Sequence, residues 1–136
     1  MRSHEQQIVR VLAERVRVLT IPQIATTWWT ETRWGRGRAS AAMNSLADEG
    51  WLHVQHALTR PIQSFDAPLV AWRCEDCRPD FTSVARSLHG RAMVDAKPVK
   101  VVFATNRATT LFSSGRAPSV KLTQMTPDLN VAEVYL

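Results

Sequence analysis

Cysteine and long hydrophobic runs are both scarce in this sequence of 136 residues. Two cysteines cannot form the disulfide framework of a small secreted domain. The longest uncharged run, Val18–Thr30, is too short and too polar to span a bilayer, and the first five residues lack the apolar core of a signal peptide. These absences predict a cytoplasmic protein with no membrane partner.

Acidic residues are outnumbered by basic ones. Seventeen Lys and Arg against twelve Asp and Glu give a net charge of +5, and fourteen of the seventeen are arginine. The planar guanidinium of arginine pairs well with phosphate. With 45% hydrophobic and 21% charged residues, the composition is otherwise that of one ordinary globular domain. Nucleic acid is therefore the first class of partner to consider.

Motifs of catalysis and metal binding are also lacking. There is no P-loop, dinucleotide-binding fingerprint or nucleophile elbow. Asp95-Ala96-Lys97 resembles half of a metal-dependent nuclease motif, but no second carboxylate can be assigned to it. Cys74 and Cys77 have the spacing of half a zinc knuckle, yet no other pair completes the site, so two reduced thiols in a turn are the simpler interpretation. We expect no catalytic residues, no metal and no cofactor, and therefore no enzyme.

Helical spacing dominates the first part of the chain. Ser3–Gln6 and Thr20–Gln23 each have the pattern of a capping box, and Pro22 suits a first helical turn. Apolar residues then recur at helical spacing, first as Val9, Leu12, Val16 and Leu19, and next as Ile21, Ile24, Ala25 and Trp28. Thr30–Gly37 is predicted as a long turn because it contains two glycines. A third helix should follow, with Ala39, Ala42, Met43 and Leu46 on its buried face and Gly50 at its end.

Strand-like alternation begins after Trp51. Leu52–Leu58 and Leu69–Arg73 are predicted to form a hairpin whose tip spans Arg60–Pro68. Helix, helix, turn, helix and hairpin is the order of a winged helix-turn-helix, which we place at residues 1–75. The predicted fold class is therefore α+β.

Residues 76–136 are predicted to form a small α/β segment after the winged helix-turn-helix. Pro79 should open a helix that ends at Gly90, and strands are expected at Val99–Ala104 and Val120–Met125. The sequence stops inside an apolar helical pattern, at Val134-Tyr135-Leu136, without a stop signal, which favours a longer natural protein.

Two stretches carry a family resemblance. Leu19-Thr20-Ile21-Pro22-Gln23-Ile24-Ala25, followed by Leu46-Ala47-Asp48-Glu49-Gly50-Trp51-Leu52, resembles bacterial winged-helix DNA-binding proteins. The final segment, Met125–Leu136, resembles the replication-relaxation family of plasmid and phage proteins, which pairs a winged helix with a second domain. That family often has His-Asp-Leu where this chain has Pro127-Asp128-Leu129, so no role of the histidine is transferred. The resemblance implies DNA binding in the control of replication or copy number.

The third predicted helix has the properties of a recognition helix. Its outward side chains are small or polar, and three arginines lie before and at its start, where the helix dipole favours phosphate. Arginine can bind guanine or phosphate, and Asn44 can bind adenine or the backbone. Trp34 is the tryptophan best suited to contact bases, whereas core packing or a dimer contact is expected for most of the others. The candidate DNA-binding residues are Arg33, Trp34, Arg36, Arg38, Ser40, Asn44 and, at the hairpin tip, Arg60.

These patterns lead to one main hypothesis and three alternatives. The main hypothesis is a sequence-specific, double-stranded DNA-binding protein that controls replication or transcription of a plasmid, phage or bacterial locus. A homodimer is expected, because one winged helix reads only a few base pairs. The alternatives are a protein-interaction module that uses Trp28 and Trp29, the DNA-binding part of a larger replication enzyme or nuclease, and a basic turn that is merely solvated.

Overall fold

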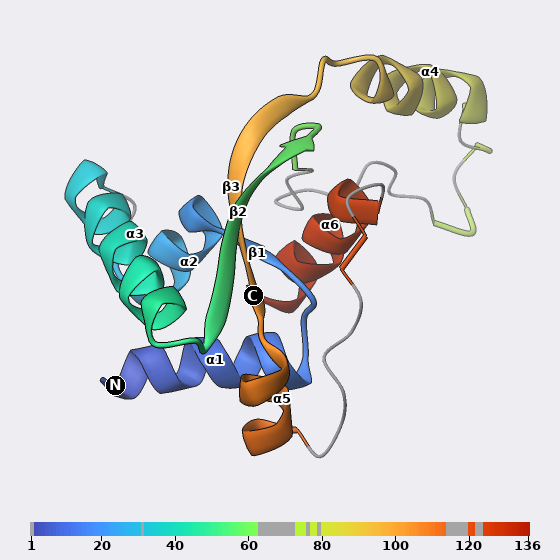
Figure 1. The fold of residues 1–136 in the computed structure, drawn as a ribbon. Coiled ribbons are helices and arrows are strands. Elements are labelled where there is room, and N and C mark those ends of the chain that lie inside the picture. The colour runs from blue at the N-terminus through green and yellow to red at the C-terminus, as the bar shows by residue number, and fades with distance from the viewer. Residues whose placement is uncertain are drawn as a thin grey trace.

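The structure, a computed structural model, describes residues 2–30, 32–62, 73–75, 77–78, 80–113, 120–121 and 124–136. This part of the chain is α+β and contains a small antiparallel sheet of three strands (Figure 1). None of the described helices is long and apolar enough to cross a membrane. The elements are α1 (Ser3–Glu14), β1 (Leu19–Thr20), α2 (Ile21–Trp28), α3 (Arg33–Asp48), β2 (Leu52–Thr59), α4 (Phe81–Ala92), β3 (Lys97–Ala104), α5 (Asn106–Phe112) and α6 (Met125–Tyr135).

The caps of the first two helices differ in how well the sequence predicted them. The capping box at Thr20 is confirmed: its backbone N–H donates to Gln23 Oε1 at 2.9 Å, and its Oγ1 accepts from the Gln23 N–H at 3.2 Å. The box predicted at Ser3 is wrong by one residue. Ser3 is already helical, and the Arg2 backbone N–H donates to Glu5 Oε2 at 2.6 Å.

The predicted turn over Thr30–Gly37 is wrong for residues 33–37, which form the first turns of α3. Thr32 Oγ1 accepts a hydrogen bond from the Gly35 N–H at 3.1 Å, and this cap starts the helix before both glycines. Gly35 is required by a close approach and not by a turn. A Cβ atom there would lie 2.0 Å from the carbonyl oxygen of Thr30.

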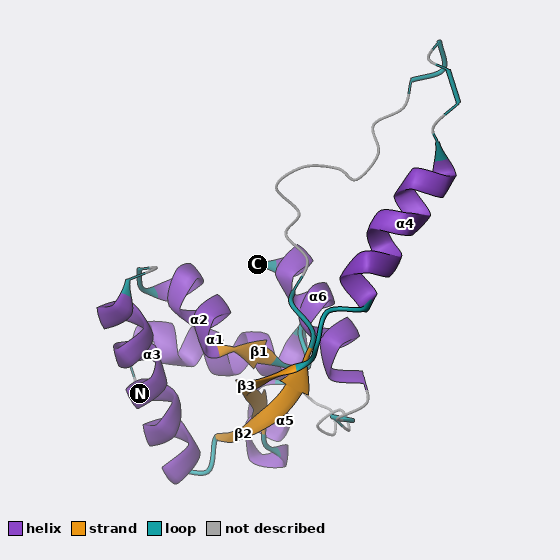
Figure 2. Cartoon of the chain, turned by 90° about the horizontal axis from the view of Figure 1, so that it is seen from above, coloured by secondary structure: helices purple, strands orange, loops and turns teal. Residues whose placement is uncertain are grey.

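The sheet has the strand order β1-β3-β2, with β3 in the centre. Strand β2, predicted correctly, pairs with β3 from Leu52 opposite Ala104 to Thr59 opposite Lys97. The two-residue strand β1, which sequence analysis did not predict, pairs with the other edge of β3. Residues 69–72 of the predicted hairpin partner lie outside the described residues, as does the hairpin tip after Ile62. The helix α4 lies in the connection between β2 and β3 and projects away from the sheet (Figures 1 and 2).

The two faces of the sheet are covered by different helices. On one face, β2 and β3 pack against α1, α2 and α3 through Leu52, Val54, Val102 and Ala104. On the other face, Ala57 and Val101 pack against Met125 and Leu129 of α6. Figures 1 and 2 show α3 and α6 on opposite sides of the β2–β3 ladder. The sheet therefore separates α3 from the C-terminal helix.

The C-terminal segment differs from its prediction at one end. The strand predicted at Val120–Met125 is wrong where it is described, because Val120 and Lys121 are not in a strand and Met125 begins α6. Pro127 and Asp128 lie in the first turn of that helix, where both residue types favour a helix start. The helix predicted to open at Pro79 and end at Gly90 is present as α4, but it begins at Phe81 and continues through Gly90 to Ala92, and Pro79 lies outside the described residues. Asp80 Oδ1 accepts hydrogen bonds from the backbone N–H groups of Thr82 and Ser83 at the start of α4.

Candidate nucleic-acid interface

The orientation of α3 follows from its buried residues. Gly35, Ala39, Met43 and Leu46 face the core. At about 100° per residue, the remaining side chains divide into two flanks. One flank carries Arg33, Arg36, Ser40 and Asn44, and the other carries Trp34, Arg38 and Ser45. The candidate residues on α3 therefore occupy both sides of its exposed surface.

The first flank of α3 lies against the central strand of the sheet. Lys100, on β3, donates from Nζ to Ser40 Oγ at 3.2 Å and to Asn44 Oδ1 at 2.9 Å. Lys100 is half-buried, whereas Asn44 is exposed. Lys100 was not among the DNA-binding residues predicted from the sequence. The sequence feature that could have identified it is a single cation inside the apolar run Val99–Ala104.

The same face of the sheet continues beyond the contact with Lys100. His56 is the cross-strand partner of Lys100, and Leu58 is the partner of Pro98. Because side chains alternate along a strand, His56 and Leu58 share the face of Val54, which packs against the core. Leu58 is 68% exposed, so helices no longer cover this part of the face. We call Arg33, Arg36, Ser40, Asn44, His56 and Lys100 the α3–sheet surface.

Among the described residues, no carboxylate neutralises the positive charge on α3. Arg33, Arg36 and Arg38 are exposed, and no carboxylate of the described residues forms an ion pair with them. Residues 33–47 contain no Asp or Glu. Glu31 precedes α3 and lies outside the described residues, and Asp48 and Glu49 follow at the C-terminal end of α3. The first turns of α3 therefore present their charge to solvent.

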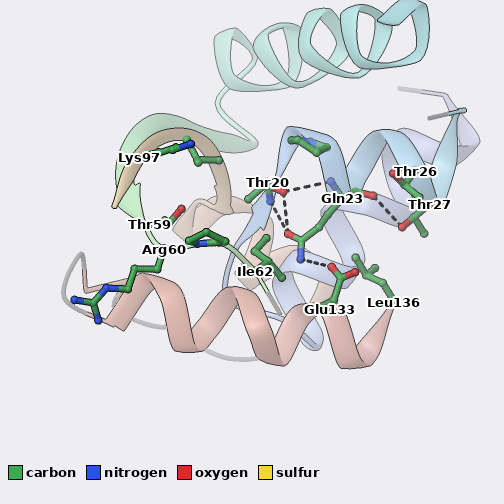
Figure 3. Close-up of a pocket in the computed structure, with 13 residues that line it drawn as sticks. Thr20, Gln23, Thr26, Thr27, Thr59, Arg60, Ile62, Lys97, Glu133 and Leu136 are labelled. Atoms are coloured by element: carbon green, nitrogen blue, oxygen red, sulfur yellow. Dashed lines mark hydrogen bonds between the residues drawn. The ribbon is translucent and has the colours of Figure 1, made fainter. Parts of the chain in front are cut away.

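Arg60 lies apart from the other candidates. It follows β2, and its backbone N–H donates to Thr126 Oγ1 of α6 at 3.2 Å. Arg60 and Lys97 line a pocket of 930 Å³ between α2, the ends of β2 and β3, and α6 (Figure 3). The structure therefore brings six of the seven candidate residues together on α3 and places Arg60 beside this pocket.

A buried glutamine on α2 links this helix to α6 beside the pocket. Gln23 is 7% exposed and donates from Nε2 to Glu133 Oε2 at 2.8 Å and to the Leu129 carbonyl oxygen at 3.2 Å. Figure 3 shows this side chain between the start of α2 and the last turns of α6. The lining combines threonine hydroxyls and apolar side chains with charges of both signs, Arg60, Lys97 and Glu133. This region joins α2 to α6 and does not share the uniform charge of α3.

The tryptophans mostly have structural positions. Trp28, Trp29 and Trp51 are half-buried against the core, which confirms their predicted packing, and Trp72 lies outside the described residues. Trp34 is 85% exposed on the first turn of α3. It is therefore the one tryptophan in the described segments whose ring faces solvent.

The described residues do not assemble a metal-binding cluster. Cys74 and Cys77 are exposed free thiols, and no group of three or more His, Cys, Asp or Glu in the described ranges could hold a metal ion. Asp95 is exposed immediately before β3.

Comparison with protein-family models, with curated proteins and with solved structures finds no match for this chain. The resemblance to winged-helix proteins and to the replication-relaxation family therefore stays a prediction. The function proposed for this chain rests on the geometry and charge of α3 and the sheet.

Proposed function

We propose that this chain is a sequence-specific, double-stranded DNA-binding protein of the winged helix-turn-helix type, with α3 as its recognition helix. The observation that carries the proposal is the exposed set of Arg33, Arg36 and Arg38 in the first turns of α3, which forms no ion pair with any described carboxylate. Arginines in this position bind phosphates and guanine, and the phosphate contacts supply most of the affinity.

The two flanks of α3 suit a helix that lies in the major groove. Such a helix has a phosphate backbone on each side, so cations are useful on both flanks. Arg33 and Arg36 would contact one backbone, and Arg38 would contact the other, with Trp34 beside it. The small side chains of Gly37 and Ala41 leave room for the helix to approach the base edges.

The order of elements supports the winged part of the proposal. Helices α1, α2 and α3 precede the antiparallel pair β2–β3, and β1 completes the sheet in the order β1-β3-β2. This arrangement sets two paired strands beside α3, and in winged helices such strands contact the backbone or the minor groove. Arg60, at the end of β2, is the candidate for this contact. The connection that contains α4 makes this wing longer than a simple hairpin.

We further propose a homodimer on a palindromic site, because one recognition helix specifies only a few base pairs. The role in controlling replication or transcription of a plasmid, phage or bacterial locus rests on the sequence resemblance alone. Measurement of mass in solution, with and without a selected duplex, tests the dimer. A single copy bound to a non-palindromic site would contradict it.

The alternatives receive less support. A partner contact through Trp28 and Trp29 would have to use side chains that already pack against the core. A metal-dependent nuclease centre at Asp95 would need several metal ligands, and no group of three or more His, Cys, Asp or Glu that could hold a metal ion occurs in the described segments.

The test of DNA binding is the salt dependence of duplex affinity. Each phosphate contact contributes about 0.9 to the slope of log K against log salt, so Arg36→Ala with Arg38→Ala should flatten the slope by about 1.8 if both bind phosphate. The control is Arg2→Ala with Arg15→Ala, which removes the same charge from exposed positions at the two ends of α1. An unchanged slope in the folded α3 variant, or equal effects of the two variants, would overturn the proposal.

A further inference from the structure

Lys100 on β3 forms hydrogen bonds with two polar side chains of α3. A lysine ammonium has three donors and no acceptor, so the atoms that it contacts must accept. These atoms are Ser40 Oγ, at 3.2 Å, and Asn44 Oδ1, at 2.9 Å. The contact with Asn44 fixes the orientation of the amide, because only its oxygen can face Lys100.

The remaining groups of this cluster are mainly donors. Asn44 is exposed, and because its Oδ1 accepts from Lys100, its Nδ2 amino group is the part of the amide left for another partner. Ser40 uses an oxygen lone pair to accept from Lys100, so its hydroxyl proton is available to donate. Asn44 Oδ1 keeps one lone pair, but an ammonium lies beside it.

The four base pairs differ in what they offer such a cluster in the major groove. Guanine presents two acceptors, N7 and O6, whereas adenine presents the N7 acceptor and the N6 amino donor. An asparagine recognises adenine by donating to N7 and accepting from N6. Here an N6 amino group that approached Asn44 Oδ1 would meet the ammonium already bound to that oxygen. The chemistry of the cluster therefore matches guanine better than adenine.

We propose that Lys100 makes Asn44 a hydrogen-bond donor and so sets the preference of the α3–sheet surface for guanine over adenine at one position of the DNA site. The inference rests on the proposed function and changes the expected role of Asn44, for which the sequence alone suggested adenine or the backbone. Lys100 is a positioning residue in this proposal, because it acts through Asn44.

The position concerned is found experimentally by selecting duplexes from a random pool with the wild-type protein and with Asn44→Ala. The base whose preference is lost in Asn44→Ala is the base that Asn44 contacts. We expect guanine there in the wild-type selection. A good contact to a base edge discriminates by about 10-fold or more, and this is the expected ratio of affinities for duplexes with guanine and adenine at that position.

The test of Lys100 is that ratio in Lys100→Met. Removal of the ammonium frees Asn44 Oδ1 to accept from adenine, so the ratio should fall to about one or reverse. Lys97→Met is the matched control, since it removes the same charge from the same strand but from its opposite face. It should keep the ratio. In the Asn44→Ala background, Lys100→Met should have no further effect on the ratio.

The outcomes separate the two proposals. If the wild type binds no duplex, the proposed function fails and this inference fails with it. If the wild type binds duplexes but selects adenine at the Asn44 position, or if no position responds to Asn44→Ala, only the inference is overturned. A Lys100→Met variant that loses affinity equally for both duplexes would show a phosphate contact and would also overturn it.

Discussion

The two faces of the β2–β3 ladder differ in how their charges are arranged. On the α3 side, Lys100 and the arginines of α3 lie without an ion-pair partner among the described carboxylates. On the α6 side, Lys97 and Arg60 line a pocket that also contains Glu133, and Gln23 links α2 to α6. Among the described residues, the first turns of α3 therefore carry cations without a neighbouring carboxylate, whereas the α6 side combines charges of both signs and packs the C-terminal helix against the sheet.

The largest effect is expected at the glycine that brings α3 close to the preceding turn. Gly35→Ala would place a Cβ 2.0 Å from the backbone oxygen of Thr30, and backbone cannot move away cheaply. We expect a loss of about 1–3 kcal/mol in the free energy of unfolding, as for other overpacked sites. Urea denaturation measures it, and the α3 side should also lose duplex affinity as its first turn shifts.

Gly37→Ala is the matched control for this prediction. It lies in the same helix, and nothing is within 4 Å of the Cβ that it would add. Alanine favours helix over glycine by up to about 1 kcal/mol, so this variant should be as stable as the wild type or more stable. Equal destabilisation by both alanines would show that the Thr30 contact does not determine where α3 begins.

The second effect concerns the α6 side. Gln23→Leu removes the donor to Glu133 and Leu129 and the acceptor for the Thr20 N–H, which leaves buried polar groups unpaired. Such losses cost about 1–3 kcal/mol. Thermal unfolding should show this cost, whereas the duplex affinity of the folded protein should be unchanged. The exposed Gln6→Leu serves as control and should change stability by less than about 0.5 kcal/mol. A selective loss of DNA affinity in Gln23→Leu would remove the distinction between the two faces.

The smallest effect on stability is expected at Trp34. Its ring is 85% exposed, so Trp34→Ala should change the free energy of unfolding by less than about 0.5 kcal/mol. In the proposed duplex complex it flanks the groove, and its loss should weaken duplex binding less than the loss of Arg36 and Arg38. Stacking on an unpaired base is worth about 1–3 kcal/mol, so a large loss confined to single-stranded DNA would indicate a different partner. Parallel titrations with duplex and single strand distinguish these results.

Local signals predicted most of the helices and the two long strands. Capping at Thr20, helical spacing in α1 to α3 and the apolar residues of β2 and β3 are all encoded within a few neighbouring residues. Strand β1 was missed because Leu19 continued the helical spacing predicted through Val16, whereas α1 ends at Glu14. The start of α3 was missed because the glycines suggested a turn while Thr32 supplied a cap. The long-range pairing of Leu19 with Val102 decides the first case, and a local cap decides the second.

The long-range contacts could not be predicted from the sequence. The pairing of β2 with β3 joins strands on either side of α4, and no local pattern states that pairing. The contact between Lys100 and Asn44 spans 56 residues, so the candidate site was predicted without the residue that orients its asparagine. Candidate residues on one helix could be recognised from spacing, whereas their neighbour on the sheet required the fold.

The central claim is that duplex DNA contacts the α3 side of the ladder. Its most direct test is the change in backbone amide NMR signals when a duplex selected from a random pool is added to the labelled protein. If duplex DNA binds the α3 side, the largest changes in amide signals fall on residues 33–44 of α3 and around Lys100 on β3. Changes confined to the region of Gln23 and Glu133, with α3 unaffected at saturation, would contradict it.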